Sequence, residues 1–486
     1  MPQLADMLFA ALLAGCLMIA PRLINQDGDT GRHIAVGRVM LAEMRIPRAD
    51  IFSHTLSGEP LTPHEWLAQV IFAAADSALG LAGVVLVSAV ALAAALALTY
   101  RQACQRSGMA LLSLAITLLG VAAASLHFLA RPHIFTLLFA TLWLGLMEWL
   151  RKANPAPLWL SGLVMLAWAN THGAFLAGFV IWAAYIADTL WHDLRSRPLR
   201  LSLPSRYLLG GGGIALLASL LNPVGAYLWH TVFDFLGSRY LVGRTQEYLP
   251  PDFQQPAAIP FLIMIALSLL VLSRQRARLP LAHALLLAGW TMMALYSARN
   301  IPIYVVVCVP ILAQAAAAGL AESRWLRLEE RIAAIQNRLR GGLWSALSVV
   351  ALVAALLLSP GLSGYIRYDA RVFPVQAANW VEANPQTGNV FNYFTWGGYL
   401  LYRLYPEYRV FIDGQTDFYG EAFTRQYETV ITLSPGWEDI LARYAVDWAI
   451  LPAGEPLAGA LRGAGWQPVY ADPTAVILAR KQSLTP

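Results

Sequence analysis

Long apolar runs separated by short polar segments follow one another from the start of the chain to about residue 360. A helix of about 20 apolar residues crosses the roughly 30 Å hydrocarbon core of a bilayer. Runs near this length predict about eleven membrane spans, at residues 4–21, 80–100, 108–127, 133–150, 156–169, 174–191, 207–221, 257–273, 281–297, 302–320 and 343–360. The pattern therefore predicts a polytopic α-helical membrane protein.

The first loop, residues 22–79, is long and carries an amphipathic pattern of its own. Asp29 can cap a helix whose apolar positions include Ile34 and Val39, and Pro47 ends it. A second helical or re-entrant piece runs from His64 to Ala78 and leads into the next span.

The character of the chain changes after the last apolar run. Residues 361–486 predict a small α/β domain in which alternating strands are interleaved with amphipathic helices. We expect helices at 375–383, 396–404, 421–431 and 437–445, and strands at 389–391, 410–413, 448–451, 467–470 and 475–478. The predicted organisation is a membrane domain, residues 1–360, with a long external loop at 22–79, followed by an extracytoplasmic domain, residues 361–486.

Composition excludes a chain of soluble domains, because 58% of the residues are hydrophobic and only 13% are charged. The mean hydropathy is +0.53. The net charge of +5 reflects arginines in loops and indicates no nucleic-acid partner. Cys16, Cys104 and Cys308 are far apart in the sequence, so neither a disulfide framework nor a cysteine metal site is predicted.

Basic residues set the expected orientation, since they gather in cytoplasmic loops of membrane proteins. They fill alternate loops and place the amino terminus inside and the carboxyl-terminal domain outside. The residues concerned are Arg101, Arg106, Arg151, Lys152, Arg195, Arg197, Arg200, Arg206, Arg274, Arg276, Arg278 and those from Arg324 to Arg340.

Short polar segments stand at the predicted outer ends of several spans. They contain His127, Arg131 and His133, then Asn170 and His172, then Arg299 and Asn300. Each could simply be a helix end, where proline, glycine and asparagine break or cap the helix and arginine reaches the head groups. Together they favour a shared outer cavity.

Arg131 and Arg299 have no acid near them in the sequence, and guanidinium groups make forked hydrogen bonds to phosphate. We therefore expect Arg131 and Arg299, with His133 and His172, to bind the phosphate of a substrate. His127, Asn170 and Asn300 would line the same pocket.

Asp27 and Asp29 supply carboxylates at the start of the first loop. A carboxylate that takes a proton from an attacking hydroxyl, with cations that stabilise a leaving phosphate, would suit transfer of a sugar from a lipid phosphate. The structural alternatives are a helix N-cap for Asp29 and a turn residue for Asp27.

Other polar residues of the external parts are candidates for the same pocket. They are His33, His64 and Glu65 in the first loop, and Asp413 and Asp417 after a predicted strand. Asp27, Asp29, His33, His64 and Glu65 include ligand types for a divalent cation, but no pair has a diagnostic spacing, so the sequence leaves metal dependence open.

The segment Asp27-Gly-Asp29-Thr-Gly-Arg-His33, about eleven spans and an outer α/β domain together resemble the membrane glycosyltransferases of the GT-C superfamily. The resemblance, closest to bacterial members, implies a multi-pass protein of the bacterial cytoplasmic (inner) membrane with its active site outside. It implies a polyprenyl-linked sugar donor, Asp29 as the catalytic base with Asp27 second, and a lipid, glycan or protein as the acceptor.

Two other classes of function remain open. A transporter or flippase of a lipid-linked sugar also needs many spans, although the sequence has no paired half-repeats with matching helix breaks. A non-catalytic glycan-assembly protein could use the outer domain to bind a glycan. Replacement of Asp29 by asparagine distinguishes these functions. Loss of sugar transfer in this variant would support the transferase, and unchanged transfer would argue against it.

Overall fold

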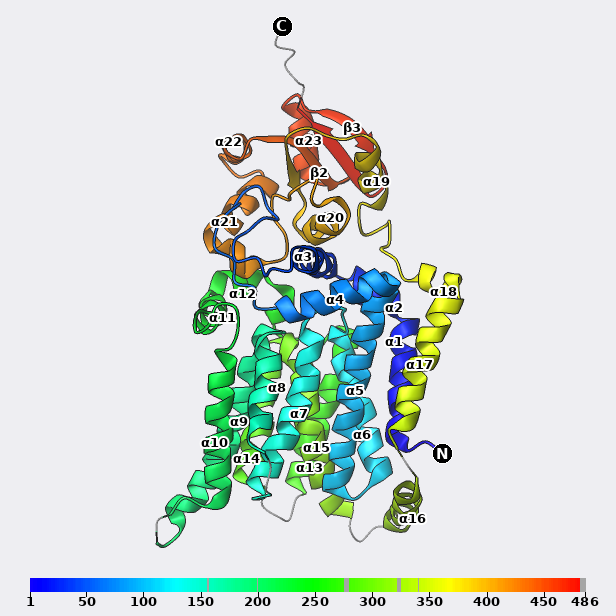
Figure 1. Ribbon diagram of the computed structural model, residues 1–486, viewed down its shortest axis with the longest axis vertical. Helices are drawn as coiled ribbons and strands as arrows, with labels where there is room; N and C mark the ends of the chain where they lie inside the picture. The colour runs from blue at the N-terminus through cyan, green and yellow to red at the C-terminus, as the bar shows by residue number, and fades with distance from the viewer. Residues whose placement is uncertain (155–156, 199, 275–278, 321–324, 340, 481–486) are drawn as a thin grey trace. The chain divides into compact units, whose positions relative to one another are not determined.

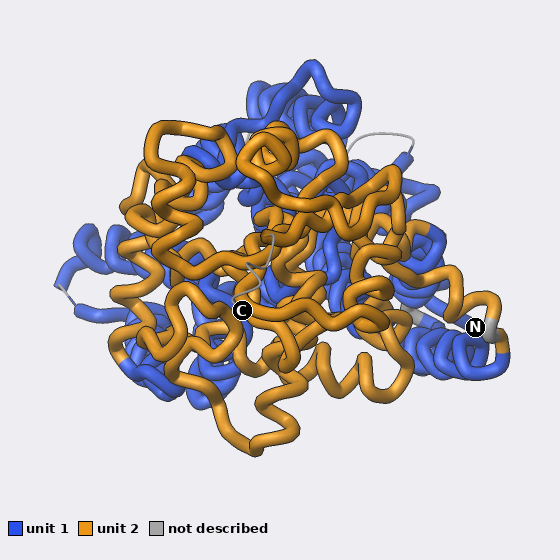
Figure 2. The backbone as a smooth tube through the Cα atoms, turned by 90° about the horizontal axis from the view of Figure 1, so that it is seen from above, with its two compact units in different colours: residues 1–18, 86–225, 243–358 blue, residues 19–85, 226–242, 359–486 orange. Residues whose placement is uncertain are grey.

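The computed structural model describes residues 1–154, 157–198, 200–274, 279–320, 325–339 and 341–480 (Figure 1). Arg276, Arg278, Arg324 and Arg340, used above for the orientation, lie outside the described residues. The chain divides into two compact units, coloured separately in Figure 2. Unit 1 contains residues 1–18, 86–225 and 243–358, and unit 2 contains residues 19–85, 226–242 and 359–486.

Unit 1 is a bundle of helices. Its longer helices are α1 (Leu4–Met18), α6 (Ala110–Ala124), α7 (His133–Arg151), α8 (Trp159–Ala169), α9 (Leu176–Arg195), α10 (Leu203–Ser219), α13 (Ile259–Ser273), α14 (Leu281–Tyr296), α15 (Ile301–Leu320), α16 (Trp325–Arg338) and α17 (Leu343–Leu358). Helices α5 (Leu81–Ser107) and α12 (Arg239–Arg244) contain residues of both units. Short 3-10 turns are η1 (Ser125–His127), η2 (Gly173–Phe175), η3 (Gln246–Tyr248), η4 (Pro256–Ala258) and η5 (Ala298–Asn300).

Helix α15 forms the centre of unit 1. It packs against α6, α7, α13 and α14, and its residues from Ile301 to Ala313 are all buried. A helix that is apolar on every side is stable only when other helices cover it, and this one is covered. The polar ends of these helices are therefore the places in unit 1 where charged side chains gather.

Unit 2 combines the first loop with the carboxyl-terminal part of the chain. Its helices are α2 (Ala20–Asn25), α3 (Asp29–Glu43), α4 (Trp66–Leu79), α11 (Tyr227–Gly237), α18 (Pro360–Tyr365), α19 (Val375–Ala383), α20 (Gly397–Leu404), α21 (Thr416–Ile431), α22 (Trp437–Arg443) and α23 (Pro456–Gly463), with the turn η6 (Phe394–Trp396). Its strands are β1 (Asn389–Asn392), β2 (Val446–Pro452), β3 (Gln467–Ala471) and β4 (Ala475–Ala479).

The four strands form one sheet in the order β1-β2-β4-β3, with β1 parallel to β2 and the other pairs antiparallel. Side chains of a strand alternate between two faces, and here both faces are buried. Trp448 and Ile450 pack in a core with residues of α3, α19 and α20. Ala449 and Leu451 pack in a second core with α21, α22 and α23.

The predicted helical membrane architecture is confirmed in outline. Among the residues that the structure describes, six stretches, built on α5, α6, α7, α9, α13 and α15, are long and apolar enough to cross a membrane, and α1, α4, α8, α14 and α17 are shorter apolar helices. The prediction counted α10 as a span and treated α4 as part of the loop. The number of spans stays a prediction.

In the predicted α/β domain, all four strands of the sheet and helix α19 lie where the sequence placed them. The strand predicted at 410–413 is wrong. The side chain of Asn392 accepts from the backbone N–H of Phe411 at 2.7 Å and donates to the carbonyl of Ile412 at 2.8 Å. The segment therefore lies extended against a side chain and makes only an isolated bridge, at Val410. Helix α23 was not predicted.

Candidate functional site

The acidic segment of the first loop begins helix α3. Gly28 occupies the N-cap position, and the carboxylate of Asp27 accepts a hydrogen bond of 2.8 Å from the backbone N–H of Asp29. The prediction that Asp29 caps this helix is therefore wrong, because Asp27 satisfies the N–H group there. Asp29 lies in the first turn, and both carboxylates are half-buried. Capping does not account for Asp29.

Glycines allow α3 to approach α20 and the segment that precedes α21. A Cβ atom on Gly28 would collide with the carbonyl of Thr395, and one on Gly398 would collide with the carbonyl of Gly28. A Cβ atom on Gly414 would collide with the carboxylate of Asp29. Residues almost four hundred positions apart thus come into backbone contact, and Asp29 lies directly against Gly414.

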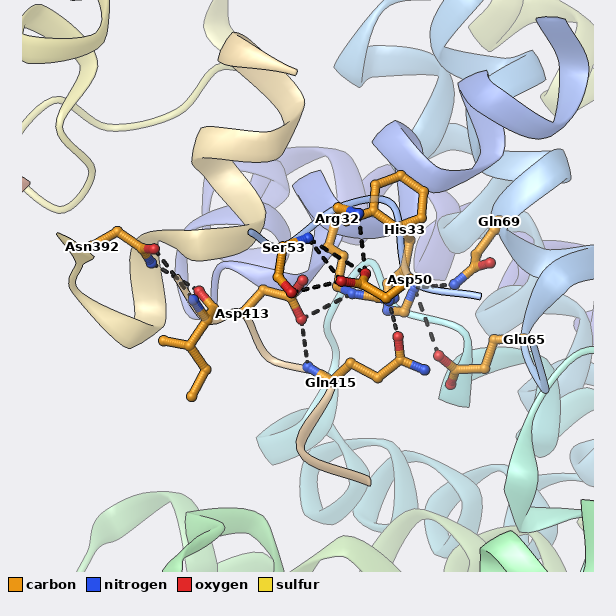
Figure 3. Close-up of polar contacts among 11 residues, drawn as sticks. Arg32, His33, Asp50, Ser53, Glu65, Gln69, Asn392, Asp413 and Gln415 are labelled. Carbon is orange, nitrogen blue, oxygen red and sulfur yellow. Dashed lines mark hydrogen bonds and ion pairs between the residues drawn. The ribbon is translucent and has the colours of Figure 1, made fainter. Parts of the chain in front are cut away.

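One turn after Asp29 in α3, Arg32 makes a buried ion pair with Asp413, shown in Figure 3. Nε of Arg32 donates to Oδ1 of Asp413 at 3.0 Å, and Nη2 of Arg32 donates to the side chain of Gln415. Arg32 is 4% and Asp413 1% exposed. Burial lowers the pKa of Arg32, but the nearby acidic groups, Asp413 foremost, together outweigh burial and raise that pKa, so Arg32 stays charged. Burial raises the pKa of Asp413, and Arg32 opposes that rise.

A second buried carboxylate, Asp50, lies in the same cluster. It accepts from the hydroxyl of Ser53 at 2.6 Å and from the backbone N–H of Phe52 at 3.0 Å. Burial raises the pKa of Asp50 against these hydrogen bonds and against the charge of Arg32. Arg32 is therefore the cation that Asp413 and Asp50 share.

The remaining first-loop candidates border this cluster. Nδ1 of His33 lies 3.7 Å from a carboxylate oxygen of Glu65, and Gln69 contacts the same nitrogen at 3.4 Å (Figure 3). Nδ1 of His64 lies 3.5 Å from a carboxylate oxygen of Asp417. The structure therefore brings the predicted residues of unit 2 together.

The interior of this cluster is closely packed. A cavity of about 10 Å³ lies among Arg32, His64, Glu65, Gln69 and Gln415, which is room for about one water molecule. A sugar does not fit inside it. Asp27, Asp29, Glu65 and Asp417 are half-buried, whereas Asp413 is buried and holds Arg32.

Unit 1 contains the second group of predicted residues, around Glu247 of η3. Nη1 of Arg299 donates to Oε1 of Glu247 at 2.6 Å and to the hydroxyl of Tyr248 at 2.9 Å. Nη1 of Arg131 lies 3.6 Å from Oε2 of the same carboxylate. Burial raises the pKa of Glu247, but Arg299 and then Arg131 outweigh burial and lower it to about 2.

Histidines surround this pair of arginines. Nη2 of Arg299 contacts Nε2 of His172 at 3.0 Å, and since a guanidinium only donates, this nitrogen must carry a lone pair. Nδ1 of His172 bonds with Thr136 at 2.9 Å. His133 bonds through Nε2 to the carbonyl of His127, whose own Nε2 is buried and has no hydrogen-bond partner among the described residues.

The side chains of the two predicted asparagines make hydrogen bonds to backbone carbonyl groups. Nδ2 of Asn170 donates to the carbonyls of Leu166 and Leu221, and Nδ2 of Asn300 donates to the carbonyl of Met293. They therefore act at least as helix-end residues.

Unit 1 also contains another buried charged cluster, around Glu148 near the end of α7. Its carboxylate accepts from Arg151 at 2.8 Å and from the hydroxyl of Tyr185 at 3.0 Å, and contacts His283 at 3.2 Å. The donors come from α7, α9 and α14, so this carboxylate ties three helices together. We assign it a structural role.

Sequence reasoning missed Glu247, Asp50 and Gln415. Arg131 and Arg299 were judged to lack an acid because none is near them in sequence, yet Glu247 contacts both. Its place in a predicted outer loop, between the spans at 207–221 and 257–273, is the signal that could have found it. Among the described residues there is no group of three histidine, cysteine or acidic side chains that could hold a metal ion.

Comparisons with known proteins show which fold this chain has. No protein-family model matches the chain, and no curated protein does. Among solved structures, the oligosaccharyltransferase of Archaeoglobus fulgidus in its apo form matches with a TM-score of 0.54 at 11% identity, over 91% of this chain and 69% of that chain.

ArnT from Cupriavidus metallidurans also matches, both bound to undecaprenyl phosphate, with a TM-score of 0.51 at 14% identity, and in the apo state, with a TM-score of 0.51 at 15% identity. Each comparison with ArnT covers 99% of this chain and 98% of that chain. The predicted resemblance is thereby confirmed at the level of fold: this chain is a multi-pass membrane protein with the GT-C fold.

Proposed function

We propose that the protein is a membrane glycosyltransferase that moves a sugar from a polyprenyl-phosphate-linked donor to an acceptor at the extracytoplasmic face. The fold is that of an oligosaccharyltransferase and of ArnT, one of whose structures holds undecaprenyl phosphate. The observation that carries the proposal is the placement of Asp29. It is half-buried in the first turn of α3 and lies against Gly414, while Asp27 accepts a backbone hydrogen bond and Asp413 holds Arg32.

Asp29 would act as the base. Its carboxylate takes the proton of the acceptor hydroxyl as that oxygen bonds to the anomeric carbon of the donor sugar. The bond between the anomeric carbon and the phosphate oxygen breaks, and the electron pair leaves with the phosphate. The buried Arg32–Asp413 pair and Gly414 fix the start of α3, and thus the direction of the Asp29 side chain.

Arg131 and Arg299 would bind the phosphate of the donor and stabilise the charge that it gains on leaving. Their common counter-ion supports this role, because a carboxylate held by two guanidinium groups marks a place that suits an anion. Glu247 would yield part of its contact with Arg299 to the phosphate. His172, which accepts from Arg299, would keep the guanidinium in place.

The test is sugar transfer by the purified full chain in lipid nanodiscs, with a panel of radiolabelled polyprenyl-phosphate sugars as donors and release of polyprenyl phosphate as the readout. We expect release by the wild type and loss of release in Asp29→Asn. Binding of undecaprenyl phosphate should be unchanged in this variant. Equal release by Asp29→Asn and wild type would remove the assignment of Asp29.

A further inference from the structure

Unit 2 has a groove that the proposed function does not use. It has a volume of about 510 Å³ and is lined by Pro21, Asn25, Tyr365, Arg367, Tyr368, Asp369, Ala370, Arg371, Val375 and Gln376. A volume of this size is in the range of pockets that hold small organic ligands. Its walls come from α2, α18 and the segment that joins α18 to α19.

Asn25 fixes the two walls of the groove to each other. Its side-chain oxygen accepts from the backbone N–H of Asp369 at 2.7 Å, and its amide nitrogen donates to the carbonyl of Arg367 at 3.0 Å. The same nitrogen donates to the carbonyl of Pro21 at 2.7 Å. The backbone that carries Arg367 is thus held in position before any ligand binds.

The charge of the groove is positive. Arg371 makes a forked ion pair with Asp369, with its closest contact at 2.7 Å, so these two charges neutralise each other. The guanidinium of Arg367 is exposed and makes no hydrogen bond or ion pair with any described residue, although it interacts electrostatically with Asp369, so the two arginines and one aspartate leave one net positive charge. An uncompensated guanidinium in a groove binds phosphate or carboxylate.

The residues of the groove follow two apolar helices in the chain, which indicates a place near the water–bilayer boundary. Pro21 and Asn25 directly follow the apolar helix α1, and Tyr365 and Arg367 follow the apolar helix α17 through α18. Tyrosine and arginine are the side chains that membrane proteins place at the level of lipid head groups. Leu357 and Leu358, at the end of α17, are 63% and 81% exposed.

We propose that this groove binds the phosphate-bearing head group of an anionic bilayer lipid, with Arg367 as its main contact. The site is separate from Arg131 and Arg299, and its existence does not depend on sugar transfer. The volume, the uncompensated guanidinium and the place at two membrane-helix ends all fit a phospholipid head group better than a neutral glycan.

The test uses the full chain in detergent, titrated with short-chain phosphatidylglycerol, with phosphatidylcholine, and with glycerol 3-phosphate in solution, and followed by native mass spectrometry. We expect phosphatidylglycerol to bind the wild type about tenfold more tightly than phosphatidylcholine. Arg367→Gln should lose about tenfold in affinity for phosphatidylglycerol, and Arg367→Lys should keep most of it. Arg462→Gln, which removes an exposed arginine of α23 outside the groove, is the matched control and should bind as the wild type does.

Equal binding of phosphatidylglycerol by Arg367→Gln and the wild type would overturn the site. Binding of glycerol 3-phosphate as tight as that of the lipid would overturn the lipid as the ligand. Because no sugar donor is present, these outcomes are independent of Asp29. Arg367 is exposed, so its replacement should leave the thermal midpoint unchanged and the comparison interpretable.

Discussion

The two groups of predicted site residues differ in the sign of their charge. In unit 2, carboxylates gather around one guanidinium, that of Arg32, and the half-buried Asp27 and Asp29 lie at the start of the same helix. In unit 1, two guanidinium groups and several histidines gather around one carboxylate, that of Glu247. A reaction that removes a proton and releases a phosphate needs both kinds of environment.

The difference also separates residues that build a site from residues that act in it. In the acidic cluster, the fully buried Asp413 and Asp50 are occupied by Arg32, Gln415 and Ser53. In the cationic cluster, Glu247 is the residue that keeps two arginines close without a substrate. Substitutions in the two clusters should therefore change different properties of the protein.

Replacement of Asp29 and replacement of Asp27 should differ strongly in their effect on the rate of sugar transfer. Asp29→Asn should lower the rate of sugar transfer by about 10³-fold, in the range of a lost general base. Asp27→Asn can still accept the hydrogen bond at the start of α3, so we expect a loss of no more than about tenfold. The rates are measured at saturating donor. Equal losses in the two variants would mean that the pair acts as a unit and that the assignment of one base is wrong.

Acid should weaken the cationic cluster. The pKa of Glu247 is about 2 in the folded protein, against its usual 4.5, so the unfolded chain takes up the proton first as the pH falls. The stabilisation is complete above about pH 5 and is lost on going towards pH 2, with a total of about 3 kcal/mol. The measurement is the thermal midpoint against pH in wild type and Glu247→Gln. A midpoint of the wild type that falls no more steeply than that of Glu247→Gln would contradict the ion pairs.

The close approach of α3 and α20 should be sensitive to one methyl group. In Gly398→Ala the new Cβ atom meets the carbonyl of Gly28, which is backbone and cannot move away cheaply. We expect a loss of about 2 kcal/mol in the free energy of unfolding. Gly459→Ala is the matched control, because this helical glycine of α23 has nothing within 4 Å of its Cβ position and alanine favours a helix. Equal stability of both variants would disprove the contact.

Replacement of Arg299 and replacement of Glu247 should change the affinity for a lipid phosphate in opposite directions. Arg299→Gln should weaken binding of undecaprenyl phosphate about tenfold, because one charge-assisted contact is lost. Glu247→Gln should strengthen it a few-fold, since the phosphate no longer competes with a carboxylate. Both affinities are measured by titration in detergent at neutral pH. Weaker binding by Glu247→Gln would show that the carboxylate organises the site and does not compete for it.

The fold was largely predictable because its signals are local. Apolar runs found the apolar helices of unit 1, although not the polar helix α16, and alternation found all four strands of the sheet. The strand predicted at 410–413 failed for a non-local reason, because the side chain of Asn392 takes the hydrogen bonds of Phe411 and Ile412. Helix α23 was missed, since it has only eight residues and begins with a proline.

The candidate site was predictable in its residue types and not in its pairing. The acidic segment stood out because charges beside an apolar run are costly. The partner of Arg131 and Arg299 could not be read from the sequence, since Glu247 is more than fifty positions from Arg299 and more than a hundred from Arg131. The pairing of Arg32 with Asp413 spans almost the whole chain.

The most direct measurement is an experimental structure of the full chain with undecaprenyl phosphate bound. We expect density for the phosphate within hydrogen-bond distance of Arg299 or Arg131. The contact between Arg299 and Glu247 should then be longer than 2.6 Å. A phosphate bound elsewhere, with both arginines still held by Glu247, would contradict this expectation.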